Sequence, residues 1–160
     1  MDLKTRDVTL VAVFAALYAA MVAAFAPLSF LALQFRVAGV IRPAVAKKPI
    51  LAVGYAIGVV VANLFSPFAG FHELVFMPVM SLVAGLAGYY AARGFGRSYF
   101  VAGAVIAVII PISVSWMLEQ LFGLPIVATL PGLLVSEQAV NVLGAFLFRA
   151  VDLRFRWYED

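Results

Sequence analysis

Long apolar runs, separated by short stretches that carry most of the charged residues, make up the greater part of this chain. Within each run the apolar residues are continuous and do not alternate with polar ones, so the pattern predicts helices rather than strands. A helix that crosses a bilayer needs about 20 such residues. We therefore expect an all-α, polytopic membrane protein with one transmembrane domain over 1–160 and six spans, at about 8–25, 37–46, 50–65, 73–92, 99–122 and 131–152.

The second of these spans is short, and Arg42 and Pro43 interrupt it. As an α-helix, the ten residues of 37–46 would cover only about 15 Å, half of the hydrocarbon core. Because backbone with unsatisfied polar groups cannot face lipid, we expect this segment to tilt, to end early or to lie against protein. The sixth span is expected to begin at Pro131, since proline suits the first position of a helix.

Composition supports the membrane assignment and narrows the function classes. The chain is 66% hydrophobic and 12% charged, with a mean hydropathy of +1.09, whereas soluble domains are about 45–50% apolar and about 25% charged. A soluble enzyme is therefore excluded, and 160 residues leave no room for an ATPase module beside six spans. The absence of cysteine and the single histidine, His72, also exclude a multi-ligand Cys or His metal site.

The basic residues predict the orientation. Nine of the eleven Lys and Arg residues fall on one side of a six-span chain: Lys4, Arg6, Lys47, Lys48, Arg93, Arg97, Arg149, Arg154 and Arg156. The positive-inside rule then places both termini in the cytoplasm. A five-span alternative that omits 37–46 would put the Lys47-Lys48 pair and the Arg93/Arg97 pair on opposite sides, so six spans are favoured.

Polar residues gather toward the other side, and we expect them to form an outward-facing substrate site. The candidate residues are Gln34, Arg36, Asn63, Glu73, Trp116, Glu119, Glu137 and Asn141. A charge within a membrane helix costs about 2.5–3.5 kcal/mol on insertion scales and needs a cavity or a partner. Trp116 and Glu119 share a helix face, which would suit a planar heteroaromatic ligand with N–H donors. The alternative is that either glutamate pairs with Arg36 or Arg42 and holds helices together.

The first span carries a row of alanines at intervals of four, namely Ala12, Ala16, Ala20 and Ala24, with Ala15, Ala19 and Ala23 beside it. Such a smooth face lets another helix approach closely. The neighbour is either another helix of this chain or a partner membrane protein.

Three stretches resemble one known family. They are Ala26-Pro27-Leu28-Ser29-Phe30 with Gln34-Phe35-Arg36-Val37, then Ala62-Asn63-Leu64-Phe65-Ser66-Pro67 with Gly70, and finally Glu137 with Val140, Leu143 and Gly144. Together they resemble the queuosine-precursor transporter (QueT) family, whose members are S components of energy-coupling factor (ECF) transporters, and the resemblance covers most of the chain. The chain departs from the family pattern at three positions. Gly39 occupies a position where the family has a glutamate, and Ser136 one where it has a glycine. The family's aspartate after the Ser-Pro motif is replaced by Glu73, which follows one extra loop residue.

The resemblance implies a six-helix S component in a prokaryotic plasma membrane, a substrate-binding subunit and not an enzyme. Its implied ligand is a 7-deazaguanine such as the 7-cyano or 7-aminomethyl compound or queuine. The implied partners are a transmembrane coupling subunit, docked on the alanine row, and two ATPase subunits that use ATP. Neither a cofactor in this chain nor nucleic acid is expected. Because of Gly39, another vitamin or nucleobase remains an alternative ligand. A small membrane enzyme and a structural subunit are the alternative functions.

Overall fold

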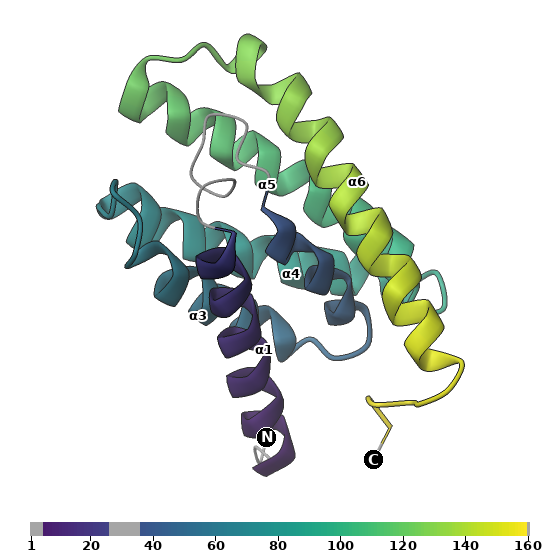
Figure 1. Ribbon diagram of the computed structural model, residues 1–160. Coiled ribbons are helices and arrows are strands. Elements are labelled where there is room, and N and C mark those ends of the chain that lie inside the picture. Colours follow the sequence, from purple (N-terminus) through teal and green to yellow (C-terminus); the bar gives the residue numbers. More distant parts are fainter. Residues whose placement is uncertain (1–4, 26–35, 160) are drawn as a thin grey trace.

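The protein is a bundle of helices (Figure 1), described by a computed structural model over residues 5–25 and 36–159. The elements are α1 (Thr5–Ala24), η1 (Val37–Ala46), α3 (Leu51–Asn63), η2 (His72–Phe76), α4 (Met77–Arg93), α5 (Tyr99–Phe122) and α6 (Ile126–Asp152). Since η2 runs directly into α4, the described residues form six helical segments. Four of them, including η2 with α4, are long and apolar enough to cross a membrane. The all-α, membrane-type fold is thereby confirmed.

The short segment η1 lies at the centre of the bundle. It contacts α1, α3, α4, α5 and α6, and eight of its ten residues are buried. Figure 1 shows it in dark blue between α1 and α6. The expectation that this segment lies against protein is therefore confirmed, and its backbone is shielded by its neighbours.

Unlike the other long elements, η1 is wound as a 3₁₀-helix. Pro43 lies inside it and lacks the N–H that an α-helical hydrogen bond would need, which disfavours regular α-helical winding. A 3₁₀-helix rises about 2.0 Å per residue, so ten residues cover about 20 Å instead of about 15 Å. The tighter winding partly compensates for the small number of residues.

Glycines let the helices around η1 approach one another closely. A Cβ on Gly58 of α3 would lie 3.0 Å from the carbonyl oxygen of Ala15 in α1, and a Cβ on Gly54 would lie 3.0 Å from that of Val11. On the other side of the bundle, a Cβ on Gly144 of α6 would overlap the backbone carbonyl of Val40 in η1. These contacts fix α1 on α3 and η1 on α6.

Charged residues join both chain ends and the link between η1 and α3 at one end of the bundle, which we call the basic end. Arg6 donates to the backbone carbonyls of Trp157 and Glu159, at 2.8 and 2.7 Å. Lys48 lies 3.5 Å from Asp7, and Lys47 lies 3.6 Å from Asp152 at the end of α6. Both ends of the described chain therefore lie together (Figure 1), as an even number of crossings requires.

Helix α6 begins at Ile126 and not at Pro131, so the predicted start was wrong by five residues. Pro125 already supplies the extended N-cap conformation, with φ −59° and ψ 135°. Pro131 then falls in the second turn, where a missing N–H costs a single helical hydrogen bond. As a consequence Glu137 lies eleven residues into the helix, about 16 Å from its start, and thus deeper than the sequence suggested.

Candidate functional site

A buried ion pair links η1 to α6. Nη1 of Arg42 pairs with Oε2 of Glu137, and the two side chains are 0% and 6% exposed. Asn141, one turn along α6, donates to both the backbone carbonyl and Oε2 of Glu137, at 2.8 and 3.2 Å. The charge of Glu137 is thus compensated within the chain, which is the internal pairing that the sequence left as an alternative.

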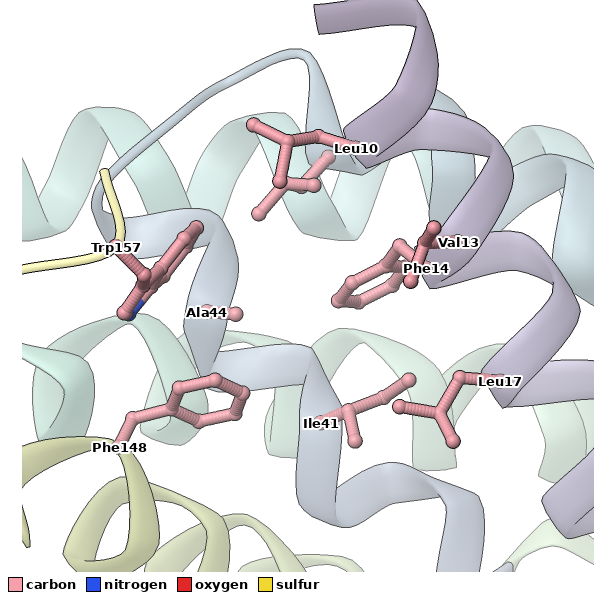
Figure 2. A pocket seen from close by; sticks show the side chains of 9 residues that line it. Leu10, Val13, Phe14, Leu17, Ile41, Ala44, Phe148 and Trp157 are labelled. Atoms are coloured by element: carbon pink, nitrogen blue, oxygen red, sulfur yellow. The ribbon is translucent and has the colours of Figure 1, made fainter. Parts of the chain in front are cut away.

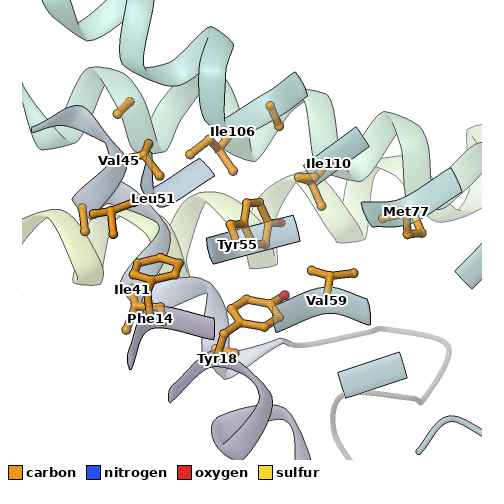
Figure 3. Close-up of a cluster of buried hydrophobic side chains, with 14 of the residues drawn as sticks. Phe14, Tyr18, Ile41, Val45, Leu51, Tyr55, Val59, Met77, Ile106 and Ile110 are labelled. Atoms are coloured by element: carbon orange, nitrogen blue, oxygen red, sulfur yellow. The ribbon is translucent and has the colours of Figure 1, made fainter. Parts of the chain in front are cut away.

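Two tyrosines complete the surroundings of Arg42. Its Nη2 donates to the Tyr18 hydroxyl of α1 at 3.1 Å, and its guanidinium carbon lies 5.2 Å from the ring centre of Tyr55 in α3. The two rings are 5.2 Å apart. Figure 3 shows them side by side, with both hydroxyls pointing toward the side on which Val59 and Met77 lie. Arg42 therefore ties η1 to α1, α3 and α6 at once.

The space beside Gly39 is filled by this same guanidinium. A Cβ at position 39 would lie 3.1 Å from Nη1 of Arg42 and 2.9 Å from Cγ1 of Val140. A glutamate at position 39, which the family resemblance leads one to expect, would need the space that Arg42 occupies. The departure at Gly39 therefore has a steric reason in this chain.

A second polar group lies at the end of the bundle opposite the basic end. Asn63 is the last residue of α3, and Glu73 lies in η2, a π-helical turn at the start of α4. Their exposures are 0% and 2%. The Asn63 side-chain amide donates to the backbone carbonyl of Glu73 at 2.7 Å. This bond fixes the amide orientation and leaves its oxygen available.

Arg36 precedes η1 at the same end and is 4% exposed. Within the described part of the chain, four buried atoms of this region have no hydrogen-bond partner: Nε and Nη2 of Arg36, Oδ1 of Asn63 and Oε2 of Glu73. We call Arg36, Asn63 and Glu73 the unpaired polar set. Buried polar groups are normally hydrogen-bonded, so each of these three residues has hydrogen-bonding capacity left for a ligand.

The structure places the remaining candidates elsewhere. Trp116 is 39% exposed, and its ring packs on Phe76 and His72, with ring centres 4.7 and 5.8 Å away. Glu119, one turn further along α5, is partly exposed. Gln34 lies outside the described residues. The candidates therefore form two separate groups, Asn63 with Glu73 and Asn141 with Glu137, and Trp116 lies nearer the surface than either.

Sequence reasoning did not include Arg42, Tyr18 or Tyr55 among the site residues. The signal for Arg42 was present, because a charge next to a proline within an apolar run needs a buried partner. Tyr18 was a weaker indication of a buried polar contact, because its hydroxyl is a polar group within the alanine-rich helix α1. Only the packing of α1 on α3 brings the two tyrosines to Arg42.

The alanines of α1 divide into two rows. Ala15 and Ala19 are buried, Ala15 against Gly58 of α3. Ala23 and the row Ala12, Ala16, Ala20 and Ala24 are exposed. An apolar pocket of about 140 Å³ lies on the other side of α1, between α1, η1, Phe148 of α6 and Trp157 (Figure 2). Packing against another helix of this chain is thereby shown for Ala15, while the row at intervals of four is exposed.

Comparison with known proteins places the chain in a family. A family model described as QueT transporter matches residues 8–153. No curated protein and no solved structure matches significantly. The matched segment runs from the first turn of α1 to the end of α6. The protein therefore belongs to the QueT transporter family, and is a transporter and not an enzyme.

Proposed function

We propose that the protein is the substrate-binding S component of an ECF-type importer that takes up a queuosine precursor, a 7-deazaguanine base. The observation that carries this proposal is the unpaired polar set. Its three residues hold four of the nine buried side-chain atoms that have no hydrogen-bond partner in the described part of this QueT-family chain. A buried polar atom left unsatisfied costs about 1–3 kcal/mol, and a bound base would remove this cost.

The chemistry of the set suits a guanine-like edge. The ring N–H and the exocyclic amine of such a base are donors, and they match the acceptor oxygens of Glu73 and Asn63. The ring carbonyl is an acceptor and matches the guanidinium of Arg36. Trp116 would supply an aromatic face and Glu119 a further carboxylate near the mouth of the site. Glu137 and Asn141 interact with each other, and Glu137 pairs with Arg42, which holds η1 against α6.

The distribution of basic residues indicates the side of the membrane from which the ligand enters. The positive-inside rule puts the basic end, with both termini, in the cytoplasm of a prokaryotic cell. The unpaired polar set lies at the opposite end and faces outward, where an importer collects its ligand. The ligand would thus enter from outside and leave only after the protein moves on its partner.

The exposed alanine row is the proposed docking face for a transmembrane coupling subunit. Small residues at intervals of four allow close approach of helix backbones in a membrane, and Ala12, Ala16, Ala20 and Ala24 are the exposed ones. Two ATPase subunits bound to that coupling subunit would supply the energy by using ATP. This chain would need no cofactor of its own.

The test is to purify the full chain in detergent, denature it and identify the small molecules that it carried by mass spectrometry. Recovery of a 7-deazaguanine supports the proposal. Recovery of a thiamin- or riboflavin-like compound favours the same fold with another ligand, which Gly39 and its neighbour Arg42 make the second candidate. For uptake, cells should accumulate labelled base only when the coupling subunit and ATPases are expressed with this chain.

A further inference from the structure

The apolar pocket of about 140 Å³ lies beside η1, between α1 and α6. Helix α1 packs on α3 and η1, whereas α6 packs on α5 and η1, so the side of η1 between these two helices borders the pocket. Figure 2 shows the side chains around it, among them Phe14 and Leu17 of α1, Ile41 of η1, Phe148 of α6 and Trp157 of the C-terminal segment. All nine lining residues are apolar or aromatic, so the pocket presents no charged group to a ligand inside it.

The pocket opens on the surface of a helix that can cross a membrane. Val13 and Leu17, which line it from α1, are 58% and 47% exposed, and α1 is long and apolar enough to span a bilayer. An apolar cavity stays free of water, and one of about 150 Å³ takes a molecule of the size of benzene. Inside a bilayer, the material that meets such an opening is the acyl chain of a lipid. The pocket has room for about six carbons of that chain.

Cations lie at the rim of the pocket that is nearest the basic end. Arg6 donates to the backbone carbonyl of Trp157, a lining residue, at 2.8 Å. Lys48 lies 3.5 Å from Asp7, the neighbour of Arg6 in α1. Nζ of Lys47 lies 4.8 Å from the ring centre of the tyrosine that follows Trp157. Contacts of α1, of the link between η1 and α3 and of the C-terminal segment therefore hold three cations beside this rim.

The carboxylates of the basic end do not balance its cations. Among the described residues this end has three carboxylates, those of Asp7, Asp152 and Glu159, which pair with Lys48, Lys47 and Arg156. It has eight cations: Arg6, Lys47, Lys48, Arg93, Arg97, Arg149, Arg154 and Arg156. A positive excess therefore remains next to an apolar pocket. Basic pockets between membrane helices bind the head groups of acidic lipids.

We propose that this pocket binds one anionic phospholipid, with the first carbons of an acyl chain inside the pocket and the phosphate at the rim near Arg6, Lys47 and Lys48. The spacing fits a lipid, in which glycerol joins the phosphate to the chain. Leu10, the lining residue nearest to Arg6 along α1, is one turn away, about 6 Å along the helix axis. A zwitterionic lipid offers the same chain, but its head group adds a cation that the basic end repels. This lipid site is distinct from the unpaired polar set at the opposite end of the bundle.

The test measures lipid binding to the full chain in detergent at pH 7 by native mass spectrometry. Phosphatidylglycerol and phosphatidylcholine with identical palmitoyl and oleoyl chains are titrated separately, so that only the head group differs. We expect one phosphatidylglycerol to bind about tenfold more tightly than phosphatidylcholine, a difference of about 1.4 kcal/mol. Inorganic phosphate at the same concentration should not compete, because it has no chain to fill the pocket. Equal affinities for the two lipids, or competition by phosphate, would overturn the proposal.

Two matched pairs of substitutions locate the head group. Arg6→Gln/Lys48→Gln removes two cations at the rim and should lower the affinity for phosphatidylglycerol toward that for phosphatidylcholine. Arg93→Gln/Arg97→Gln removes two exposed cations between α4 and α5, a link that does not line the pocket, and should leave both affinities nearly unchanged. Thermal unfolding without added lipid checks that the variants fold. Equal losses in the two variants would mean that the lipid binds the whole basic end without a defined site, and would overturn the proposal.

The variant Ala44→Leu tests the pocket itself. Ala44 lines the pocket, and its side chain lies among those of Phe14, Phe148 and Trp157 in Figure 2. The leucine adds three carbons to a space for about six, so both lipids should bind more weakly. Ala139→Leu, the same change at an exposed position of α6 outside the pocket, is the matched control and should bind both lipids as the unchanged chain does.

Lipid binding that Ala44→Leu leaves intact would show that the acyl chain lies elsewhere, and the proposal would be wrong. If this intact lipid binding were accompanied by loss of a dimer, the pocket would instead hold a second copy of the chain. If it were accompanied by loss of binding to the coupling subunit, the pocket would hold a side chain of that partner.

Discussion

Arg42 of η1 and Glu137 of α6, 95 residues apart in the sequence, form an ion pair in the interior of the bundle. The pair holds a short, central helix against a long one, and Tyr18 and Asn141 add one hydrogen bond to each partner. A pair of this kind stabilises only as a unit, because either charge alone would be buried without compensation.

Removing one partner of this pair should be strongly destabilising. We expect Glu137→Gln or Arg42→Met to lower the free energy of unfolding by about 3–5 kcal/mol, measured by thermal or denaturant unfolding in detergent. The double variant Arg42→Met/Glu137→Leu should recover most of this loss, since apolar residues of similar volume replace both charges. The double variant should also retain ligand binding. A folded double variant without binding would show that the Arg42–Glu137 pair contributes to ligand binding.

Substitution by alanine at two glycines of α6 should change the stability of the protein in opposite directions. Gly144→Ala introduces a Cβ into the backbone carbonyl of Val40 and should destabilise the protein by about 1–3 kcal/mol through overpacking. Gly132→Ala has nothing within 4 Å of its new Cβ and should stabilise by about 0.5–1 kcal/mol, the helix preference of alanine over glycine. Comparable thermal unfolding of the two variants would contradict the close packing of η1 on α6.

Glu73 and Glu119, the two acidic candidates at the end of the bundle opposite the basic end, should differ in their effect on ligand affinity. Glu73→Gln removes a buried, unpartnered carboxylate and should weaken binding of a neutral 7-deazaguanine by roughly tenfold or more, as the loss of a charge-assisted hydrogen bond does. The partly exposed Glu119 should contribute less, with a change of at most about threefold on Glu119→Gln. Calorimetric titration compares them directly, and a larger effect of Glu119→Gln would move the site toward α5.

The exposed alanine row should matter for transport and not for binding. Ala16→Leu and Ala20→Leu add bulk to a face that is exposed in the isolated chain, so folding and ligand binding should persist while uptake is lost. Ala139→Leu, the same change at an exposed position of α6, is the matched control and should leave uptake unchanged. Normal uptake by Ala16→Leu and Ala20→Leu would exclude this face as the docking surface.

Hydrophobic pattern alone predicted the positions of the helices well, because runs of apolar residues and their polar interruptions are local properties. It predicted the range of η1 but not its 3₁₀ winding, which depends on Pro43 and on the neighbours that enclose it. It misplaced the start of α6, because two prolines, at 125 and 131, could each begin a helix and the sequence does not rank them.

The candidate site was predictable only in part. Burial of a charge in a membrane helix signalled that Glu137 needed a partner, and Arg42 was one of the two cations considered. Which cation would reach it depended on the packing of η1 against α6, and that packing depends on Gly144 and Val40. The separation of Glu73 and Asn63 from Glu137 likewise arises from three-dimensional packing, because all three looked equivalent along the chain.

The winding of η1 also sets a length. Its ten residues cover about 20 Å as a 3₁₀-helix, and rewinding to an α-helix would shorten it by about 5 Å. Arg36 lies at one end and Lys47 at the other, so such shortening would draw Arg36 and the basic end toward each other. It would also rotate Arg42 by about 60° relative to Gly39, since 3₁₀ geometry aligns residues three apart and α geometry does not. The winding of this segment thus sets the distance between Arg36 and the basic end.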